Sequence, residues 1–174
     1  MTAAPHPRFT MHPTPIGDVL TVTTDEGIVT LHPLRGPVEQ ELERLTRALR
    51  SPLDRVDDDP AAHDAGRQLD EYFSRGRREF DLTLDWRLVR GFTRAALEAV
   101  REIPYGETAG YGEVAAHAGS PRAARAVGTA CATTPFSIIV PVHRVVRADG
   151  SIGEYGGHPE VKAFLLDLER AASE

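Results

Sequence analysis

Residues 111–128 read YGEVAAHAGSPRAARAVG. The first seven predict a short helix, and Ala118-Gly119-Ser120 predicts a tight turn. Ser120 followed by Pro121 is a typical helix start, so a second helix is expected from there towards Ala132. Two short helices joined by a turn of about three residues make residues 111–132 a candidate helix-turn-helix. Plain helical hairpins share this pattern, so alone it does not decide between the two interpretations.

The segment before this stretch is also helical. Residues 92–103 carry apolar side chains at helical spacing, among them Phe92, Ala96 and Val100, and Pro104 ends the pattern. We therefore expect a mainly α C-terminal domain over residues 87–174 that contains the helix-turn-helix.

The first half of the chain differs in kind. Alternating apolar residues between 8 and 34 predict strands, with a hairpin around Asp25-Glu26-Gly27. Further predictions are helices over 38–51 and 63–73, an exposed acidic loop over 53–62 and a strand over 80–84. The expected fold class is an α/β N-terminal domain over residues 1–86, with a small antiparallel sheet plus helices.

The composition is that of an ordinary soluble protein, with 41% hydrophobic residues in 174. No stretch approaches the roughly 20 apolar residues that a membrane-spanning helix needs. The opening residues 1–15 lack the apolar region of a signal peptide, and we expect them to form a frayed terminus. A cytoplasmic monomer that does not bind membranes is expected.

Cys131 is the single cysteine of the sequence. One thiol can form neither an intrachain disulfide nor a cysteine-rich zinc site, and the seven histidines lack metal-ligand spacing. We expect no metal and no cofactor.

The net charge of −6 argues against a nucleic-acid partner when taken alone. Its distribution is uneven, because residues 87–147 hold eight Arg and four Glu and so carry +4, which leaves −10 for the rest. A basic segment in an acidic chain is compatible with a local DNA contact.

Several phrases of the second half share one order and spacing with a known family. They are Ile103-Pro104-Tyr105-Gly106-Glu107-Thr108, Tyr111-Gly112-Glu113-Val114-Ala115, Ala123-Ala124-Arg125-Ala126-Val127-Gly128, Ile138-Ile139-Val140-Pro141-Val142-His143-Arg144-Val145-Val146, Gly150-Ser151-Ile152-Gly153-Glu154-Tyr155-Gly156-Gly157, and Lys162 with Leu165-Leu166-Asp167-Leu168-Glu169. The sequence resembles the O6-alkylguanine-DNA alkyltransferases, closely over residues 92–170 and loosely over 8–85. A run of this length is far more specific than a lone motif.

The resemblance implies a chemistry. Such proteins place a helix-turn-helix in the DNA minor groove and flip the damaged guanine into a pocket. A cysteine in a Pro-Cys-His-Arg turn then accepts the alkyl group, activated by a histidine that water connects to a glutamate. The matching positions are Pro141, His143 and Glu169, but Val142 stands where the cysteine is expected. Valine has no nucleophilic atom, although its similar size lets the pocket keep its shape.

DNA-contacting residues follow from the same resemblance. Arg125 matches the arginine that fills the space of the flipped base, and Tyr111 matches the tyrosine that pushes on the target phosphate. Arg122 and Ala123 are expected on the first turn of the recognition helix, where phosphate contacts are natural. The structural alternatives are a solvated helix arginine and an aromatic side chain at the edge of the core.

Pocket residues are implied as well. Tyr155 matches a tyrosine that faces the flipped guanine, and Gly156 and Gly157 let the backbone approach the base. His158 follows these glycines and either changes substrate preference or points to water, while Pro159 is expected to stiffen the loop.

Two further positions depart from the family pattern. Thr134 replaces an asparagine that hydrogen-bonds the active-site turn, so weaker bracing is expected. Cys131 matches a pocket position, where either an inert buried thiol or a relocated nucleophile is compatible with the sequence. Arg144 is expected to brace the turn by hydrogen bonds.

The favoured hypothesis is a non-catalytic alkyltransferase-like protein that binds O6-alkylguanine in duplex DNA and marks it for a downstream excision-repair protein. One alternative is a methyltransferase inactivated by the Cys-to-Val replacement. The other is a repurposed pocket that acts on a small molecule through His143, Tyr155 or Cys131.

Overall fold

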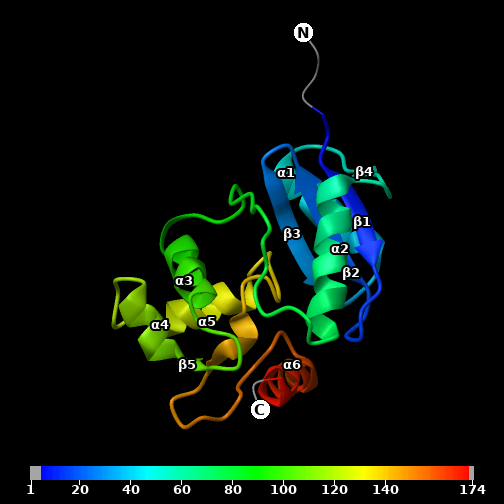
Figure 1. Cartoon of the computed structure of the whole chain (residues 1–174). Coiled ribbons are helices and arrows are strands. Elements are labelled where there is room, and N and C mark those ends of the chain that lie inside the picture. Colours follow the sequence, from blue (N-terminus) through cyan, green and yellow to red (C-terminus); the bar gives the residue numbers. More distant parts are fainter. Residues whose placement is uncertain (1–4, 173–174) are drawn as a thin grey trace. The chain divides into compact units, whose positions relative to one another are not determined.

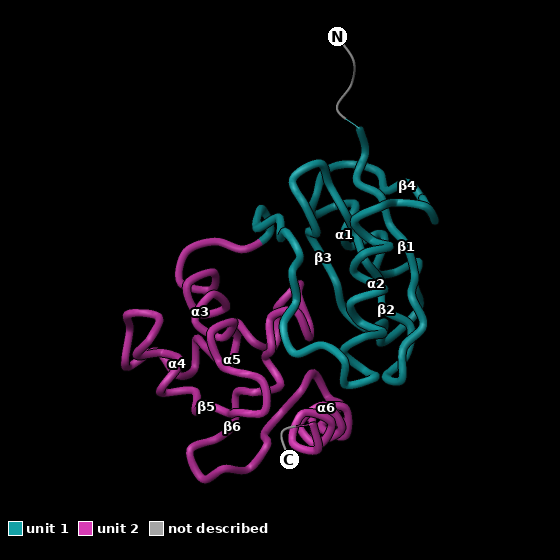
Figure 2. Tube along the Cα trace, viewed as in Figure 1, with its two compact units in different colours: residues 1–88 teal, residues 89–174 magenta. Residues whose placement is uncertain are grey.

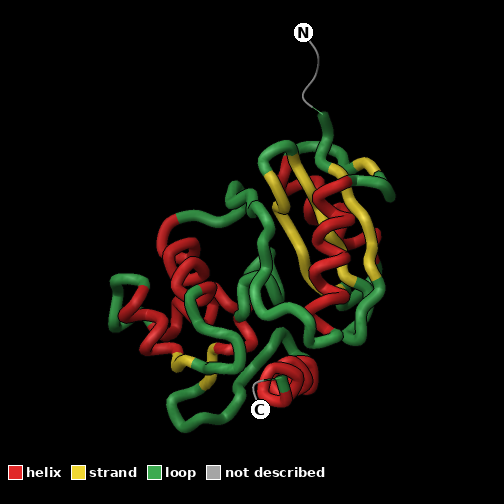
Figure 3. Tube along the Cα trace, viewed as in Figure 1, coloured by secondary structure: helices red, strands yellow, loops and turns green. Residues whose placement is uncertain are grey.

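The computed structural model describes residues 5–172, and the chain divides into two compact units, residues 1–88 and 89–174 (Figure 2). Unit 1 is an α/β structure, whereas unit 2 is mainly helical (Figure 3). The expected change of fold class between the two halves of the chain is confirmed.

Unit 1 is built on a four-stranded sheet with the order β3-β2-β1-β4. The strands are β1 Arg8–His12, β2 Val19–Thr24, β3 Gly27–Pro33 and β4 Asp54–Arg55. The predicted hairpin is confirmed, since β2 and β3 pair antiparallel around the turn, and β1 pairs antiparallel with β2.

Three expectations for this unit are wrong in part. The sheet is mixed rather than antiparallel, because β4 pairs parallel to β1. That strand lies within the segment predicted as a loop, which also holds the buried Asp59. The residues of β1, predicted to belong to a frayed terminus, are paired on both sides, while the first four residues of that terminus lie outside the described part of the chain.

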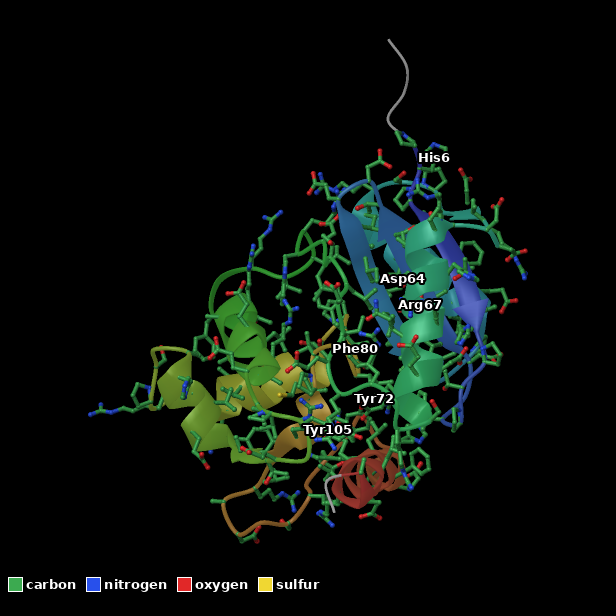
Figure 4. The ribbon with its side chains drawn as sticks, in the orientation of Figure 1. His6, Asp64, Arg67, Tyr72, Phe80 and Tyr105 are labelled. Atoms are coloured by element: carbon green, nitrogen blue, oxygen red, sulfur yellow. The ribbon has the colours of Figure 1, made fainter. Side chains whose placement is uncertain are left out.

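The predicted strand over 80–84 does not form. Only Leu84 makes a bridge, to Ile28 at the edge of the sheet. Phe80 turns away instead and places its ring 5.4 Å from that of Tyr72 (Figure 4). The segment pairs with the sheet only around Leu84, where the Ile28 N–H donates to the Thr83 carbonyl and the Asp85 N–H donates to the Ile28 carbonyl.

Two helices cover the sheet of unit 1. They are α1 Val38–Leu49 and α2 Pro60–Phe73, with α2 in front of the sheet in Figure 1. Leu45 of α1 packs with Leu20 and Val22 of β2 in one apolar cluster. Asp59 caps α2 by accepting a hydrogen bond from the Ala62 N–H, which satisfies a donor that the helix itself leaves open.

Unit 2 contains four α-helices, one 3₁₀ turn and two short strands within its described residues, 89–172. They are α3 Gly91–Arg101, β5 Ala109–Gly110, α4 Tyr111–His117, α5 Ala124–Ala132, η1 Val142–Arg144, β6 Val145–Val146 and α6 Pro159–Ala171. Helices α3, α4 and α5 pack against one another, and β5 pairs parallel with β6. The pairing places the end of η1 next to the start of α4.

Helix α5 begins at Ala124, three residues later than the Ser120–Pro121 signal predicts. The Ala123 N–H donates to the Ser120 carbonyl at 2.9 Å, which closes a turn instead of a first helical turn. Proline fits the second position of such a turn as well as it fits the start of a helix. Arg122 and Ala123, expected on the first turn of this helix, therefore lie before α5.

Candidate functional site

Two tight turns shape the segment that leads to η1. Ile138 has φ of 72°, which is rare for a β-branched residue, and the Ile139 N–H donates across it to the Ser137 carbonyl at 2.8 Å. Pro141 has φ −79° and ψ 63°, and the Val142 N–H donates to the Val140 carbonyl at 2.7 Å. Both arrangements are γ-turns, the first of the rare strained kind. The backbone of η1 is thus fixed by its own turns.

A charged cluster lies buried beneath η1. Glu169 of α6 accepts hydrogen bonds from His143 Nε2 at 2.7 Å and from Arg144 Nε and Nη2 at 2.9 Å each. Arg144 Nη1 donates to the Ile103 carbonyl at 2.7 Å, and the Gly106 N–H donates to Glu169 at 3.3 Å. The cluster joins η1, α6 and the turn after α3, and it confirms the bracing expected of Arg144.

Burial and hydrogen bonding set the charges of this cluster. Burial raises the pKa of Glu169, but the hydrogen bonds from His143 and Arg144 outweigh it and lower the pKa to about 2. Burial also lowers the pKa of His143, against the opposing effect of Glu169. A neutral imidazole therefore faces an ionised carboxylate, and the ring proton lies on Nε2.

The same protonation leaves His143 Nδ1 as a hydrogen-bond acceptor. This atom is buried and has no hydrogen-bond partner among residues 5–172. The expected water link between His143 and Glu169 is wrong, because the two side chains bond directly at 2.7 Å.

Val142 is 4% exposed and is the first residue of η1, directly before His143. Its isopropyl group can neither accept nor donate a proton. The turn that holds it therefore presents an apolar surface next to the neutral imidazole.

Cys131 lies near the end of α5 and is half-buried. Burial raises the pKa of its thiol to about 12, against the opposing effect of Lys162. The thiol is therefore protonated at pH 7. This disfavours Cys131 as a relocated nucleophile.

Thr134 braces a different part of the chain from the one expected. Its hydroxyl oxygen accepts a hydrogen bond from the Phe136 N–H at 3.1 Å. The bond stays within the segment that precedes the two γ-turns, because the threonine side chain is short.

The loop between β6 and α6 carries the other pocket candidates. Tyr155 is buried, and Gly156 and Gly157 have φ of 54° and 80°, a backbone conformation that favours glycine. The His158 side chain is 45% exposed and bonds Glu160 at 2.9 Å. Pro159 is the first residue of α6 and starts that helix rather than stiffening the loop.

The helix-turn-helix candidates lie on the surface of unit 2. Arg122 and Arg125 are exposed, and neither pairs with a carboxylate within the described residues. Arg122 and Ala123 line a surface hollow together with Ser120 and Pro121. Tyr111 begins α4 and is half-buried, which raises the pKa of its hydroxyl.

The structure brings His143 and Glu169 into contact, whereas Arg122 and Arg125 lie on the surface of α5 and the turn before it. Sequence reasoning assigned no role to Lys162, which is buried and donates to the Val145 carbonyl at 2.6 Å. A signal was present, because Lys162 and Glu169 flank Leu165 and Leu166 at the spacing of one buried helix face.

Comparison with known proteins identifies the family. Residues 91–171 match the 6-O-methylguanine DNA methyltransferase DNA binding domain, and residues 8–86 match the ribonuclease-like domain of the same proteins. The chain belongs to this family. A methylated-DNA–protein-cysteine methyltransferase of Methanosarcina acetivorans is 35% identical over 161 residues, which cover 92% of this chain and 97% of that protein.

Other members of the 6-O-methylguanine DNA methyltransferase family show a comparable similarity to this chain. The methylated-DNA–protein-cysteine methyltransferase of Mycolicibacterium paratuberculosis is 41% identical over 156 residues, 88% of this chain and 92% of the relative. Among solved structures, Mycobacterium tuberculosis OGT in complex with DNA superimposes with a TM-score of 0.80 at 34% identity, over 95% of this chain and 94% of that one.

The described residues offer no candidate for two other kinds of site. Within residues 5–172 no group of three or more His, Cys, Asp or Glu side chains is placed to hold a metal ion. No helix in the described part of the chain is long and apolar enough to cross a membrane.

Proposed function

We propose that this chain binds O6-alkylguanine in duplex DNA by minor-groove insertion and base flipping and does not transfer the alkyl group. The supporting observation is the combination at η1 of an aliphatic Val142, at the position that matches the acceptor cysteine, with the buried His143–Arg144–Glu169 cluster. Such a cluster stabilises a fold only when all its partners are present. The histidine and glutamate that would activate a thiol are therefore present without a nucleophile beside them.

Two observations support DNA as the partner. A structure with a TM-score of 0.80 to this chain is described as a complex with DNA. In this chain Arg122 and Arg125 are exposed near the start of α5 without a carboxylate partner among the described residues. Unpaired guanidinium groups are suited to phosphate contacts and to filling the space of an extruded base. The bound lesion would then be shielded and passed to a downstream excision-repair protein in the cytoplasm.

The test is a binding titration at fixed, stated salt. Two duplexes of one sequence are compared, one with a single O6-methylguanine and one undamaged. We expect at least tenfold tighter binding of the damaged duplex, about 1.4 kcal/mol. Equal affinities would contradict lesion recognition.

The second measurement is the intact mass of the protein after incubation with excess O6-methylguanine duplex. We expect no change, because Val142 has no nucleophilic atom and burial keeps the Cys131 thiol protonated, which disfavours its attack on the methyl carbon. A stoichiometric gain of one methyl group would overturn the non-catalytic assignment, and peptide mapping would show whether Cys131 carries it.

A further inference from the structure

Arg147, the residue that follows β6, has no role in the site described above. Its backbone is held in a closed turn, since the Arg147 N–H donates to the Ser151 carbonyl at 3.0 Å and the Gly150 N–H donates to the Arg147 carbonyl at 2.9 Å. Asp149 within this turn accepts hydrogen bonds from the Ser151 N–H and hydroxyl. The turn therefore fixes where the Arg147 side chain leaves the backbone.

The side chains of Arg147 and Tyr111 both approach Gly153. A Cβ atom placed on this glycine would lie 3.5 Å from Arg147 Nε and 3.6 Å from the Tyr111 hydroxyl. The two donors are therefore at most about 7 Å apart. Two hydrogen bonds of about 2.9 Å to two oxygens of one phosphate group span a comparable distance.

Two hydrogen-bond donors at this place, Arg147 and the Tyr111 hydroxyl, are suited to an anion. Arg147 is exposed and has no carboxylate within ion-pair distance among residues 5–172. Asp149, in the same turn, accepts hydrogen bonds from Ser151, and Arg147 adds to the lowering of its pKa, so Asp149 is a nearby negative charge. Burial raises the pKa of the Tyr111 hydroxyl, which keeps it a neutral O–H donor at pH 7. A cation and a neutral donor thus lie within about 7 Å of each other, with Asp149 and Glu154 as the nearby opposing charges.

We propose that Arg147 and Tyr111 together bind one backbone phosphate next to the flipped nucleotide. This inference rests on the proposed function and adds a residue to it. Gly153 contributes by leaving open the space that a side chain would fill between the two donors. The loop that continues from Gly153 carries the buried Tyr155, so the clamp lies two residues before the tyrosine that the proposed function assigns to the flipped base. Holding the phosphate there positions the extruded base.

The test is a double-mutant cycle that combines a substitution in the protein with a chemical change in the DNA backbone. Arg147→Ala is compared with the native chain on an O6-methylguanine duplex and on the same duplex with single neutral methylphosphonates at the phosphates flanking the lesion. On the native phosphates we expect Arg147→Ala to weaken binding about tenfold, the low end for a charge-assisted hydrogen bond after salt screening. The log–log salt slope should become shallower by about one.

One methylphosphonate position should remove the effect of Arg147→Ala, because the phosphate charge that Arg147 contacts is then absent. Arg101→Ala is the matched control, an exposed arginine in the last turn of α3 without an ion pair in the described region. Its effect should be equal on all duplexes. Arg147→Lys should recover part of the affinity, since it restores charge but not the two-pronged donor.

The same titrations distinguish failure of the phosphate clamp from failure of the proposed function. A native chain that prefers the lesion duplex, with an Arg147→Ala loss that no methylphosphonate changes, would overturn the clamp alone. A native chain with equal affinity for damaged and undamaged duplexes would overturn the proposed function. Circular dichroism of each variant checks that the exposed substitutions leave the fold intact.

Discussion

At the scale of single residues, position 142 decides the chemistry and position 143 decides the protonation state around it. Glu169 is ionised and fixes the His143 proton on Nε2, so Nδ1 remains an acceptor. This arrangement is suited to taking a proton from a neighbouring thiol, and Val142 offers none.

Val142→Cys should therefore restore single-turnover methyl acceptance. Valine and cysteine are similar in volume, and the proton acceptor is already in place. We expect a reaction about a hundredfold slower than that of related transferases, since Thr134 bonds Phe136 rather than the active-site turn and errors of position are costly. Intact mass over time, with His143→Gln in the same background as the control, measures it. Folded Val142→Cys protein that binds the lesion and gains no methyl would show that more than the sulfur is missing.

The pH dependence of stability follows from His143. Burial lowers its pKa below the ordinary 6.5, so the unfolded chain binds a proton that the folded chain resists. Stability should be highest above pH 6.5 and decrease as the pH falls below it. A second loss should follow as the pH falls from 4.5 towards 2, when Glu169 becomes protonated.

Urea midpoints at pH 7.5 and 5.0 measure the first of these losses. His143→Gln should be less stable at both pH values, because it breaks a buried bond to Glu169, but it should show a smaller difference between them. An unchanged difference would assign the pH dependence to other groups.

At the scale of elements, α5 and the turn before it present their arginines to solvent. Arg125→Ala should weaken binding to the O6-methylguanine duplex more than binding to undamaged duplex, because the side chain acts only when a base has left the stack. We expect a difference of about tenfold, which the same two-duplex titration measures. Arg101→Ala serves as the control. Equal losses on both duplexes would reduce Arg125 to a phosphate contact.

The ends of α1 and α2 carry arginines in a backbone conformation that favours glycine. Arg50 and Arg75 have φ of 53° and 64°, and both are exposed. In each case the next residue donates back to a carbonyl five residues earlier, Thr46 or Glu71, as in a Schellman end. Both helices therefore end with the usual Schellman hydrogen bond. The positive φ at that position is strained because arginine, unlike glycine, has a Cβ atom.

Arg50→Gly should stabilise unit 1 by about 0.5–1 kcal/mol, because glycine adopts a positive φ without a steric penalty. Thermal unfolding measures the effect. Arg47→Gly, one turn earlier inside α1, should destabilise by about the same amount, since a helical interior disfavours glycine. A lower melting temperature for Arg50→Gly would show that the arginine side chain contributes more than its backbone strain costs.

At the scale of the whole molecule, the charge is divided unevenly along the chain. Residues 87–147 carry +4, while the chain as a whole carries −6. Many arginines of unit 1 pair with carboxylates, as Arg8 does with Asp59 and Arg44 with Glu41. In unit 2, Arg122, Arg125 and Arg147 have no such partner within the described residues.

Binding to duplex DNA should therefore show a modest dependence on salt. Three to five neutralised phosphates would give a slope of about −3 to −4.5 in log affinity against log salt concentration. Titrations between about 50 and 200 mM salt measure it. A slope near zero would contradict binding to the DNA backbone, and a slope near about −10 would require many more contacts than these arginines provide.

The sequence predicted most helices and the β2–β3 hairpin, because their hydrophobic spacing and turn residues act locally. It misjudged elements that depend on distant partners. Asp54 and Arg55 become a strand because β1 lies beside them, and of the strand predicted over 80–84 only Leu84 bridges to the sheet. Pro121 misplaced the start of α5 because one fixed φ suits both a turn and a helix.

In the candidate site, too, some features follow from the local sequence and others arise only from tertiary packing. The sequence by itself determined that position 142 has no nucleophile and that Arg122 and Arg125 follow a tight turn, since side-chain chemistry and turn signals are properties of the local chain. Only the tertiary structure decided that Glu169 bonds His143 directly, that Cys131 is kept protonated by burial, and that Arg147 and Tyr111 both approach Gly153. Distances between residues far apart in sequence, and the desolvation that follows from burial, arise only when the elements pack.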